Sequence, residues 1–165
     1  MNPFISGNVF KVGDNINTDL ILPARYLDLY EPKELGPHAF EGMGLMFVEK
    51  LKGSTIVVGG ENFGLGSARE QAPNAMKGAG IQAVIAKSFA RIFYRNTLNV
   101  GVAAIECPEA AESIEESEIV SIHLESGTIQ AGMKTYRFAS FSGPTMDLLR
   151  AGGMVPLLKK KLVLS

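Results

Sequence analysis

Five residues at 54–58, Ser-Thr-Ile-Val-Val, form an apolar run that leads into a glycine-rich loop and then into a helical pattern over 71–80. β-Branched residues in such a run are typical of a buried strand. Two further apolar runs, at 81–86 and 102–105, enclose a second helical pattern over 88–97. The middle of the chain therefore predicts strand, helix, strand, helix, strand, which is the layering of an α/β fold.

The two ends of the chain modify the expected sheet. Residues 7–12 alternate as a strand does, and 119–124, 127–130 and 134–138 predict an antiparallel meander. These strands favour a mixed, partly barrel-like sheet with flanking helices over a purely parallel one. We expect a single domain over 1–165, because 165 residues supply one sizeable core and little more.

The remaining segments give weaker signals. Asp19 stands in a polar turn, and a short apolar stretch that we interpret as a strand follows it and ends at Pro23. Short helical pieces are expected within 24–51, and terminal helical turns at 144–151 and 153–160.

Composition excludes several classes of function. The chain is 46% hydrophobic and 20% charged with a net charge of −1, and it has no basic stripe beyond Lys159–Lys161, so nucleic-acid binding has no support. We interpret those lysines as a solvated tail or helix end. No basic leader and no apolar window long enough to span a bilayer is present, so we expect a cytoplasmic protein with no membrane partner.

Cysteine and histidine usage argues against a metal centre on this chain. Cys107 is the one cysteine, which excludes an internal disulfide and a cluster held by this chain's thiolates alone. His38 and His123 lack the spacing of metal ligands. We therefore expect no metal site.

The glycine-rich loop reads Gly-Gly-Glu-Asn-Phe-Gly-Leu-Gly-Ser-Ala-Arg-Glu over 59–70. Gly64 and Gly66 allow a tight turn and a close approach of the backbone to a ligand. We expect the helix to begin at Ser67, with Arg69 in its first turn, so that free N–H groups and a guanidinium face one spot. These donors favour a carboxylate or phosphate ligand.

A structural role would explain the same residues. Ser67 and Glu70 have the spacing of a capping box, which is common and carries no chemistry. The loop fits neither a Walker loop nor the dinucleotide fingerprint. The loop alone therefore leaves a ligand site and a helix cap open.

Two other segments, 13–30 and 88–101, carry polar residues at marked positions. Taken in order with the glycine loop, they resemble the small subunit of 3-isopropylmalate dehydratase, the stand-alone swivelling domain of the aconitase superfamily. The resemblance is strong over 7–107. The matching motifs are Gly13-Asp14, Asn17-Thr18-Asp19, Pro23 to Leu27, Asn62 to Glu70, Ala72-Pro73, and Ser88 to Asn96 with Asn99 and Gly101.

The resemblance implies a swivelling-domain fold and a hydro-lyase that removes and re-adds water on a small 2-hydroxy dicarboxylate, as in leucine and other branched-chain amino acid biosynthesis. It also implies a heteromer, in which a separate large subunit holds a 4Fe–4S cluster on three cysteines. That division agrees with the single Cys107. We expect no cofactor on this chain, activity only with the large subunit, and homo-oligomers of the isolated chain through apolar surface that the partner would cover.

The resemblance also assigns residues. In the family, the serine at the position of Ser67 acts as an alkoxide that takes a proton from the substrate, and Asp19 matches an active-site acid that we expect to orient the site. The start of the helix, the loop amides at Gly66 and Ala68, and Arg69 would stabilise the oxyanion and bind a substrate carboxylate.

Four residues bear on specificity. The family usually reads Ser-Ser-Arg-Glu-His where this chain has Ser-Ala-Arg-Glu-Gln, so Ala68 removes a hydroxyl and Gln71 replaces a histidine. The loop after Leu27 sets substrate choice in related enzymes; Asp28 would repel a third carboxylate, and Leu29 could meet an alkyl group. We expect an alkyl-substituted malate, with isopropylmalate first and dimethylmalate or citramalate/citraconate as alternatives. A non-catalytic anion-binding regulatory module is the alternative from another class.

Overall fold

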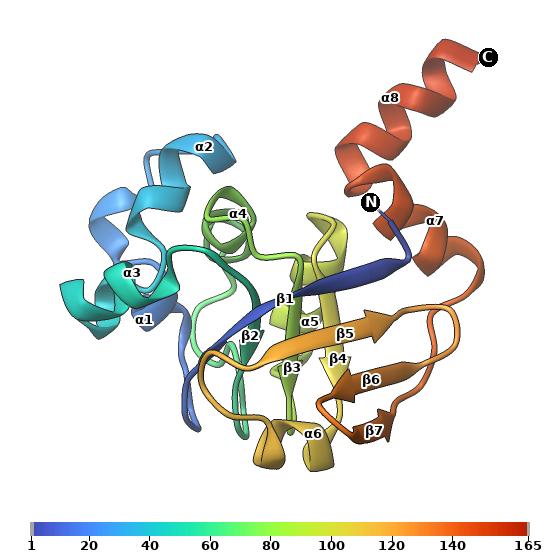
Figure 1. The fold of residues 1–165 in the computed structure, drawn as a ribbon. Helices are drawn as coiled ribbons and strands as arrows, with labels where there is room; N and C mark the ends of the chain where they lie inside the picture. Colours follow the sequence, from blue (N-terminus) through green and yellow to red (C-terminus); the bar gives the residue numbers. More distant parts are fainter. Residues whose placement is uncertain (1, 165) are drawn as a thin grey trace.

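The computed structural model describes residues 2–164, and a seven-stranded sheet forms their centre. Its strands are β1 (Phe4–Lys11), β2 (Ser54–Val58), β3 (Ala83–Ala86), β4 (Ala103–Glu106), β5 (Ile119–His123), β6 (Thr128–Ala131) and β7 (Lys134–Arg137). They lie in the order β4-β3-β2-β1-β5-β6-β7 (Figure 1). Neighbours from β1 to β4 run parallel, and β5 to β7 form an antiparallel meander paired with β1. The mixed sheet predicted from the sequence is confirmed.

The sheet curls into a half-barrel, with β5 to β7 lying over part of one face of the parallel strands (Figure 1). A core cluster fills the space between these two parts, and it includes Ile56 and Ile85 from parallel strands and Ile122 and Ile129 from the meander. Helices α6 (Pro108–Ser113) and α7 (Gly143–Ala151) contribute buried side chains to the same cluster. The apolar alternation of the meander therefore closes one side of the core.

A second core cluster lies on the opposite face, because successive residues of a strand point to opposite sides of the sheet. Val57 and Val84 belong to it, whereas their neighbours Ile56 and Ile85 belong to the first. Five helices contribute to this second cluster: α1 (Thr18–Ile21), α2 (Pro32–Leu35), α3 (Leu45–Leu51), α4 (Gln71–Gly78) and α5 (Arg91–Asn99). Three short 3-10 turns, Ala24–Tyr26, Gly36–His38 and Glu41–Met43, lie between α1 and α3 in the chain.

The last helix, α8 (Met154–Leu164), follows α7 after two glycines in the left-handed region, Gly152 and Gly153. It projects from the body of the molecule toward the C-terminus (Figure 1). The predicted terminal turns thus form, and the second of them continues into a helix of 11 residues.

Two predicted elements differ from the structure. The apolar stretch after Asp19 is the helical turn α1 rather than a strand, because the Asn17 side chain accepts a hydrogen bond from the backbone N–H of Leu20 and caps it. Helix α5 begins at Arg91 rather than at residue 88. Ser88 is engaged with the glycine loop instead, since its carbonyl accepts from the N–H of Phe63 at 3.0 Å.

Candidate active site

Three loops meet at the carboxyl ends of adjacent parallel strands β1, β2 and β3, which is where open α/β sheets bind ligands. The glycine loop after β2 stands between the other two. On one side, the N–H of Gly64 donates to the carbonyl of Ile16 at 2.7 Å, and the N–H of Thr18 donates to Leu65 at 2.9 Å. On the other side, the N–H of Ala90 donates to Phe63 at 2.9 Å. Backbone hydrogen bonds therefore fix the loop on both flanks.

The glycines have the conformations that the sequence predicted. Gly64 has φ +84° and Gly66 has φ +101°, both in the left-handed region that favours glycine. These turns leave Ser67 exposed at the wall of a hollow of about 230 Å³. The hollow is lined by Thr18, Gly64, Gly66, Ser67, Ala68, Arg69, Ala90, Arg91, Ile92 and Phe93. Ser67, Gly66, Ala68 and Arg69, predicted as site residues, are thus brought together.

The expected helix start at Ser67 is wrong. Helix α4 begins at Gln71, its N-cap is Glu70, and no side chain caps it, so the capping box does not form. The cause lies in the contact with the first loop, where the buried Thr18 hydroxyl donates to the carbonyl of Ser67 at 3.0 Å. Together with the left-handed Gly66, this contact keeps Ser67 to Arg69 outside the helix.

A different helix presents its start to Ser67. The first residues of α5, Arg91 to Phe93, line the same hollow, and the N–H groups of a helix's first turn have no partner within the helix. They carry partial positive charge, which stabilises an anion close by. The predicted combination of a serine hydroxyl with a helix start is therefore present, but α5 supplies the helix rather than α4.

Asp19 reaches this site as an ion pair. Its Oδ1 lies 2.5 Å from Nη1 of Arg69, with the Arg69 side chain 17% exposed and that of Asp19 60% exposed. Asp19 belongs to the first turn of α1, whose N-cap is Asn17. The two residues are 50 positions apart in the chain, and the pair holds the guanidinium at the wall of the hollow.

The two predicted specificity residues lie away from the hollow. Asp28 is exposed, whereas Leu29 is partly buried and packs against the second core cluster, and neither belongs to the hollow's lining. Gln71 connects them to the site, because its Nε2 donates to the carbonyl of Leu27 at 3.2 Å. The residue that replaces the family's usual histidine thus anchors the loop that carries Asp28 and Leu29.

Sequence reasoning missed a polar network beneath that loop. Glu41, whose side chain is 13% exposed, accepts from the Tyr26 hydroxyl at 2.7 Å, lies 2.8 Å from His38 Nδ1 and pairs with Arg25. The Tyr26 and His38 rings stack with centroids 3.7 Å apart. The sequence did not indicate this network, because Glu41 stands in a segment that has neither helical nor strand periodicity.

Replacing Glu41 by glutamine tests the network through acid stability. Burial opposes ionisation of Glu41, but hydrogen bonds from Tyr26, His38 and Arg25 outweigh it and lower the pKa of the carboxyl below its ordinary value. Stability from this group is therefore present above the unfolded pKa and is lost as the pH falls through the lower folded pKa. We expect Glu41→Gln to lower the melting temperature at pH 7, and the difference from the wild type to shrink below about pH 4.5 as the wild-type carboxylate becomes protonated.

The matched control is Glu49→Gln. Glu49 is 70% exposed and pairs with Lys52 on the surface, where ion pairs contribute little. The melting temperature of Glu49→Gln should equal that of the wild type at every pH. A constant difference between Glu41→Gln and the wild type from pH 7 to pH 3 would contradict the proposed role of the charge.

The structure adds two findings on metals and membranes. Among residues 2–164, no three His, Cys, Asp or Glu side chains gather closely enough to hold a metal ion. Cys107 is buried, and its thiol donates to the carbonyl of Arg137 at 3.5 Å. Over the same range, no helix combines the length and apolar content needed to cross a bilayer.

Comparison with known proteins agrees with this geometry. The family model described as the aconitase C-terminal domain matches residues 30–110, and the curled mixed sheet with a glycine loop at its strand ends is consistent with a swivelling domain of the aconitase type. The isopropylmalate/citramalate isomerase small subunit of Methanocaldococcus jannaschii is 46% identical over 98% of both chains. The 3-isopropylmalate dehydratase small subunit of Saccharolobus islandicus is 46% identical over 94% of both.

A solved structure gives the same result in three dimensions. The crystal structure of 3-isopropylmalate dehydratase from Methanocaldococcus jannaschii superimposes with a TM-score of 0.88 at 43% identity, covering 98% of this chain and 96% of the other. The chain therefore belongs to the family of 3-isopropylmalate dehydratase small subunits.

Proposed function

We propose that this chain is the small subunit of a two-subunit hydro-lyase that dehydrates and rehydrates an alkyl-substituted malate. The observation that carries the proposal is the shared hollow, in which Ser67, Arg69 and the start of α5 converge at the strand ends. Its relatives are named as small subunits of 3-isopropylmalate dehydratase or of an isopropylmalate/citramalate isomerase, and a small subunit implies a large one.

Ser67 is the proposed base. In dehydration a proton leaves the carbon beside a carboxylate, and the Ser67 alkoxide would accept it and become the hydroxyl. A serine hydroxyl is a weak base at neutral pH, so the alkoxide needs stabilisation from nearby donors. The N–H groups at the start of α5, the loop amides at Gly66 and Ala68, and the Arg69 guanidinium surround the hollow and can supply it.

Arg69 is the proposed ligand for a substrate carboxylate, because its planar fork matches two carboxylate oxygens. Asp19 holds the guanidinium in place through the 2.5 Å contact. Ala68 offers its backbone to the hollow but no hydroxyl, and Leu29 and Asp28 would act from the adjoining loop once the partner encloses the substrate.

The partner subunit is required on two grounds. The hollow of about 230 Å³ is open and smaller than the roughly 300–1,000 Å³ of ordinary ligand pockets, so another surface has to complete it. The chain's one cysteine cannot supply the three thiolates of a 4Fe–4S cluster, and we place that cluster on the large subunit. There it would supply the Lewis acid for the departing hydroxyl.

The test is co-expression with the large subunit of the same organism, followed by assay of isopropylmalate, citramalate and dimethylmalate through the absorbance of the unsaturated product. We expect turnover by the complex and none by the isolated chain. Isopropylmalate and citramalate both belong in the assay, since one relative is named for both. A complex that binds these acids without turnover would favour the anion-binding regulatory module. We further propose that the chain acts in leucine biosynthesis and is cytoplasmic.

Arg69→Lys separates binding from chemistry. Lysine keeps the charge but loses the two-pronged contact, so we expect KM to rise about tenfold with a smaller change in kcat. Arg95→Lys is the matched control, because Arg95 is exposed on α5 and does not line the hollow. An unchanged KM for Arg69→Lys would remove Arg69 from contact with the substrate.

A further inference from the structure

Of the side chains that the structure describes, helix α8 exposes five large apolar ones, and all of them except Val163 lie along one side of the helix. Met154 is 39% exposed, Val155 60% and Leu158 50%, and their spacing places them together on the helix surface. Leu157 borders the Met154 end of this group, and it is partly buried against the first core cluster. Met154, Val155 and Leu158 are called the α8 stripe below, and Leu162 continues its line one turn further along.

Lysines border the α8 stripe on both sides. Lys161 lies three residues after Leu158, and Lys159 lies four after Val155, so each is a neighbour of the stripe on the helix surface. Lys160 is exposed and lies on the side of the helix opposite the stripe. The sequence of α8, Met-Val-Pro-Leu-Leu-Lys-Lys-Lys-Leu-Val-Leu, contains no acidic residue. The stripe thus fits an apolar surface flanked by carboxylates.

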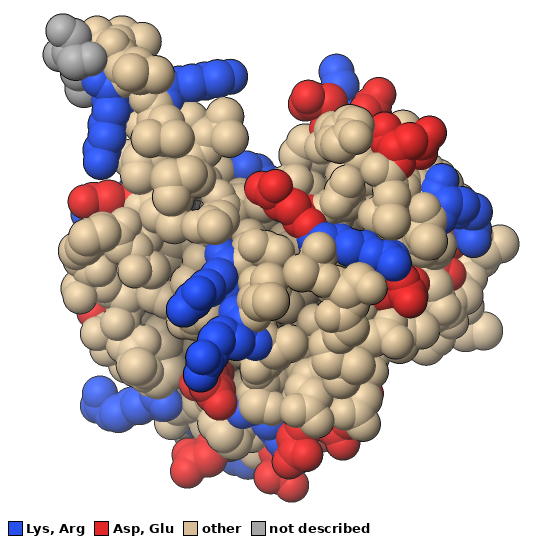
Figure 2. All heavy atoms as spheres, turned by 180° about the vertical axis from the view of Figure 1, so that it is seen from behind, with Lys and Arg blue, Asp and Glu red and all other residues tan. Residues whose placement is uncertain are grey.

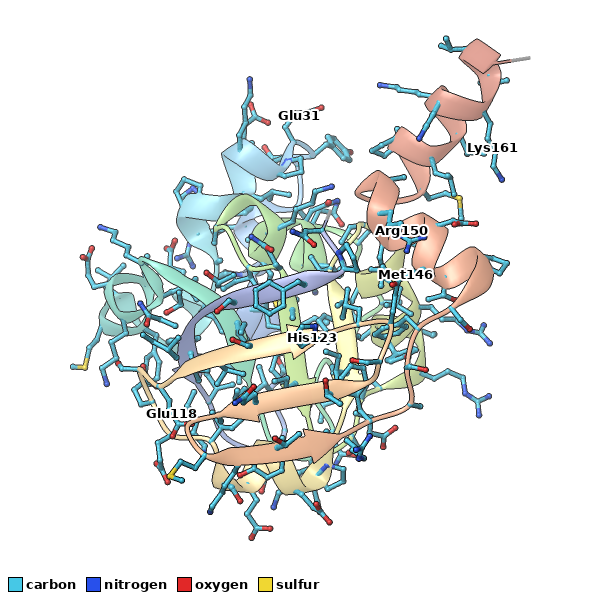
Figure 3. All side chains as sticks on the ribbon, turned by 45° about the vertical axis from the view of Figure 1, so that its right-hand side comes forward. Glu31, Glu118, His123, Met146, Arg150 and Lys161 are labelled. Carbon is cyan, nitrogen blue, oxygen red and sulfur yellow. The ribbon has the colours of Figure 1, made fainter. Side chains whose placement is uncertain are left out.

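The stripe begins inside a cleft. Val155 lines a cavity of about 320 Å³ together with Tyr30, Glu31 and Glu70. Figure 2 shows this cleft as a notch between the projecting end of the molecule and the part built around α2. In Figure 3, Glu31 lies on the α2 side, and Lys161 lies on the side of α8 that points away from α2.

The cleft adjoins the candidate active site along the chain. Glu70 directly follows Arg69, which lines the hollow, and Tyr30 directly follows Leu29, which belongs to the predicted specificity loop. A partner subunit that covers the hollow can therefore also contact the cleft and α8.

We propose that the α8 stripe and the cleft at its base dock the large subunit, through an apolar segment of that subunit flanked by carboxylates. This inference rests on the proposed function. A second copy of this chain is a poorer occupant, because pairing two α8 helices would bring their lysines together. An anionic membrane is also poorer, because its evenly spread negative charge would face Glu31 and Glu70 at the base of the stripe as well, whereas a protein segment can present its carboxylates to Lys159 and Lys161 alone.

The experiment measures the affinity of the purified chain for the large subunit by calorimetry, with turnover recorded separately. We expect Leu158→Glu to raise Kd at least about tenfold, since it places a charge in the buried centre of the interface. Lys159→Glu combined with Lys161→Glu should also raise Kd about tenfold, more strongly at low salt. Lys160→Glu is the control, with Kd within about twofold of the wild type. Circular dichroism checks that each variant is folded.

The next three results would overturn the docking proposal. An unchanged Kd for Leu158→Glu, or no wild-type complex, removes the stripe from the interface. A wild-type homodimer that Leu158→Glu dissociates, with large-subunit binding intact, assigns the stripe to a second copy. Binding to phosphatidylglycerol vesicles that the same variant abolishes, again with large-subunit binding intact, assigns it to a membrane. A complex that forms through α8 but does not turn over alkylmalates would instead refute the proposed function alone.

Discussion

Ser67→Ala is expected to reduce the turnover of the assembled enzyme by about a hundredfold or more, the usual cost of losing a positioned base. The melting temperature of the isolated chain should not change. Ser67 is exposed, and the hydrogen bond that the structure gives it runs from the Thr18 hydroxyl to its backbone carbonyl, which alanine retains. The measurement is kcat of the complex with the preferred alkylmalate, beside the melting temperature of the isolated chain.

The control for this variant is Ser126→Ala, an exposed serine in the turn between β5 and β6. It should retain full turnover. Association of Ser67→Ala with the large subunit should match the wild type, so that lost activity cannot be ascribed to lost assembly. Turnover of Ser67→Ala within a few-fold of the wild type would show that another group is the base.

Gly64→Ala is expected to cost about 3 kcal/mol or more of unfolding free energy, from about 1 kcal/mol for a left-handed non-glycine residue and up to about 3 kcal/mol for overpacking. An added Cβ would lie 2.0 Å from Cγ of Phe93, which is 3% exposed. Phe93 lies in the first turn of α5 and lines the hollow. Turnover should therefore fall as well, because the start of α5 must shift.

Gly53→Ala is the control for Gly64→Ala, because it carries the backbone strain of a left-handed alanine without the steric clash. Gly53 has φ +81°, close to the +84° of Gly64, but an added Cβ there would meet nothing within 4 Å. We expect a loss of about 1 kcal/mol, measured by urea unfolding, and normal turnover. If both variants lost the same unfolding free energy, Phe93 would be able to move away from the added Cβ without a measurable loss of stability, and the contact would not fix the position of α5.

Local signals in the sequence account for most of the fold. The β-branched run at 54–58, the alternation in 119–138 and the glycines at helix ends each act over a few residues, so they can be interpreted without knowledge of the partner strand. The stretch after Asp19 was misinterpreted because four residues of helix held by an Asn17 cap have no periodicity to detect.

The candidate site was only partly predictable. Ser67, Gly66, Ala68 and Arg69 lie within four residues, and all line one hollow as expected. The network around Glu41 depends on residues that approach only after folding, and the sequence contains no spacing rule for such contacts.

The sequence by itself determined the strand–loop–helix order, the left-handed glycines and the presence of a serine and an arginine beside them, because these depend on intrinsic backbone and side-chain preferences. Only the tertiary structure decided that α5 rather than α4 presents its N–H groups to Ser67, and that Asp19 holds Arg69. Both outcomes follow from contacts between loops far apart in the chain: Ala90 donates to Phe63, and Thr18 donates to Ser67, 49 positions away. Those bonds keep residues 67–69 outside a helix where local preference alone would have begun one.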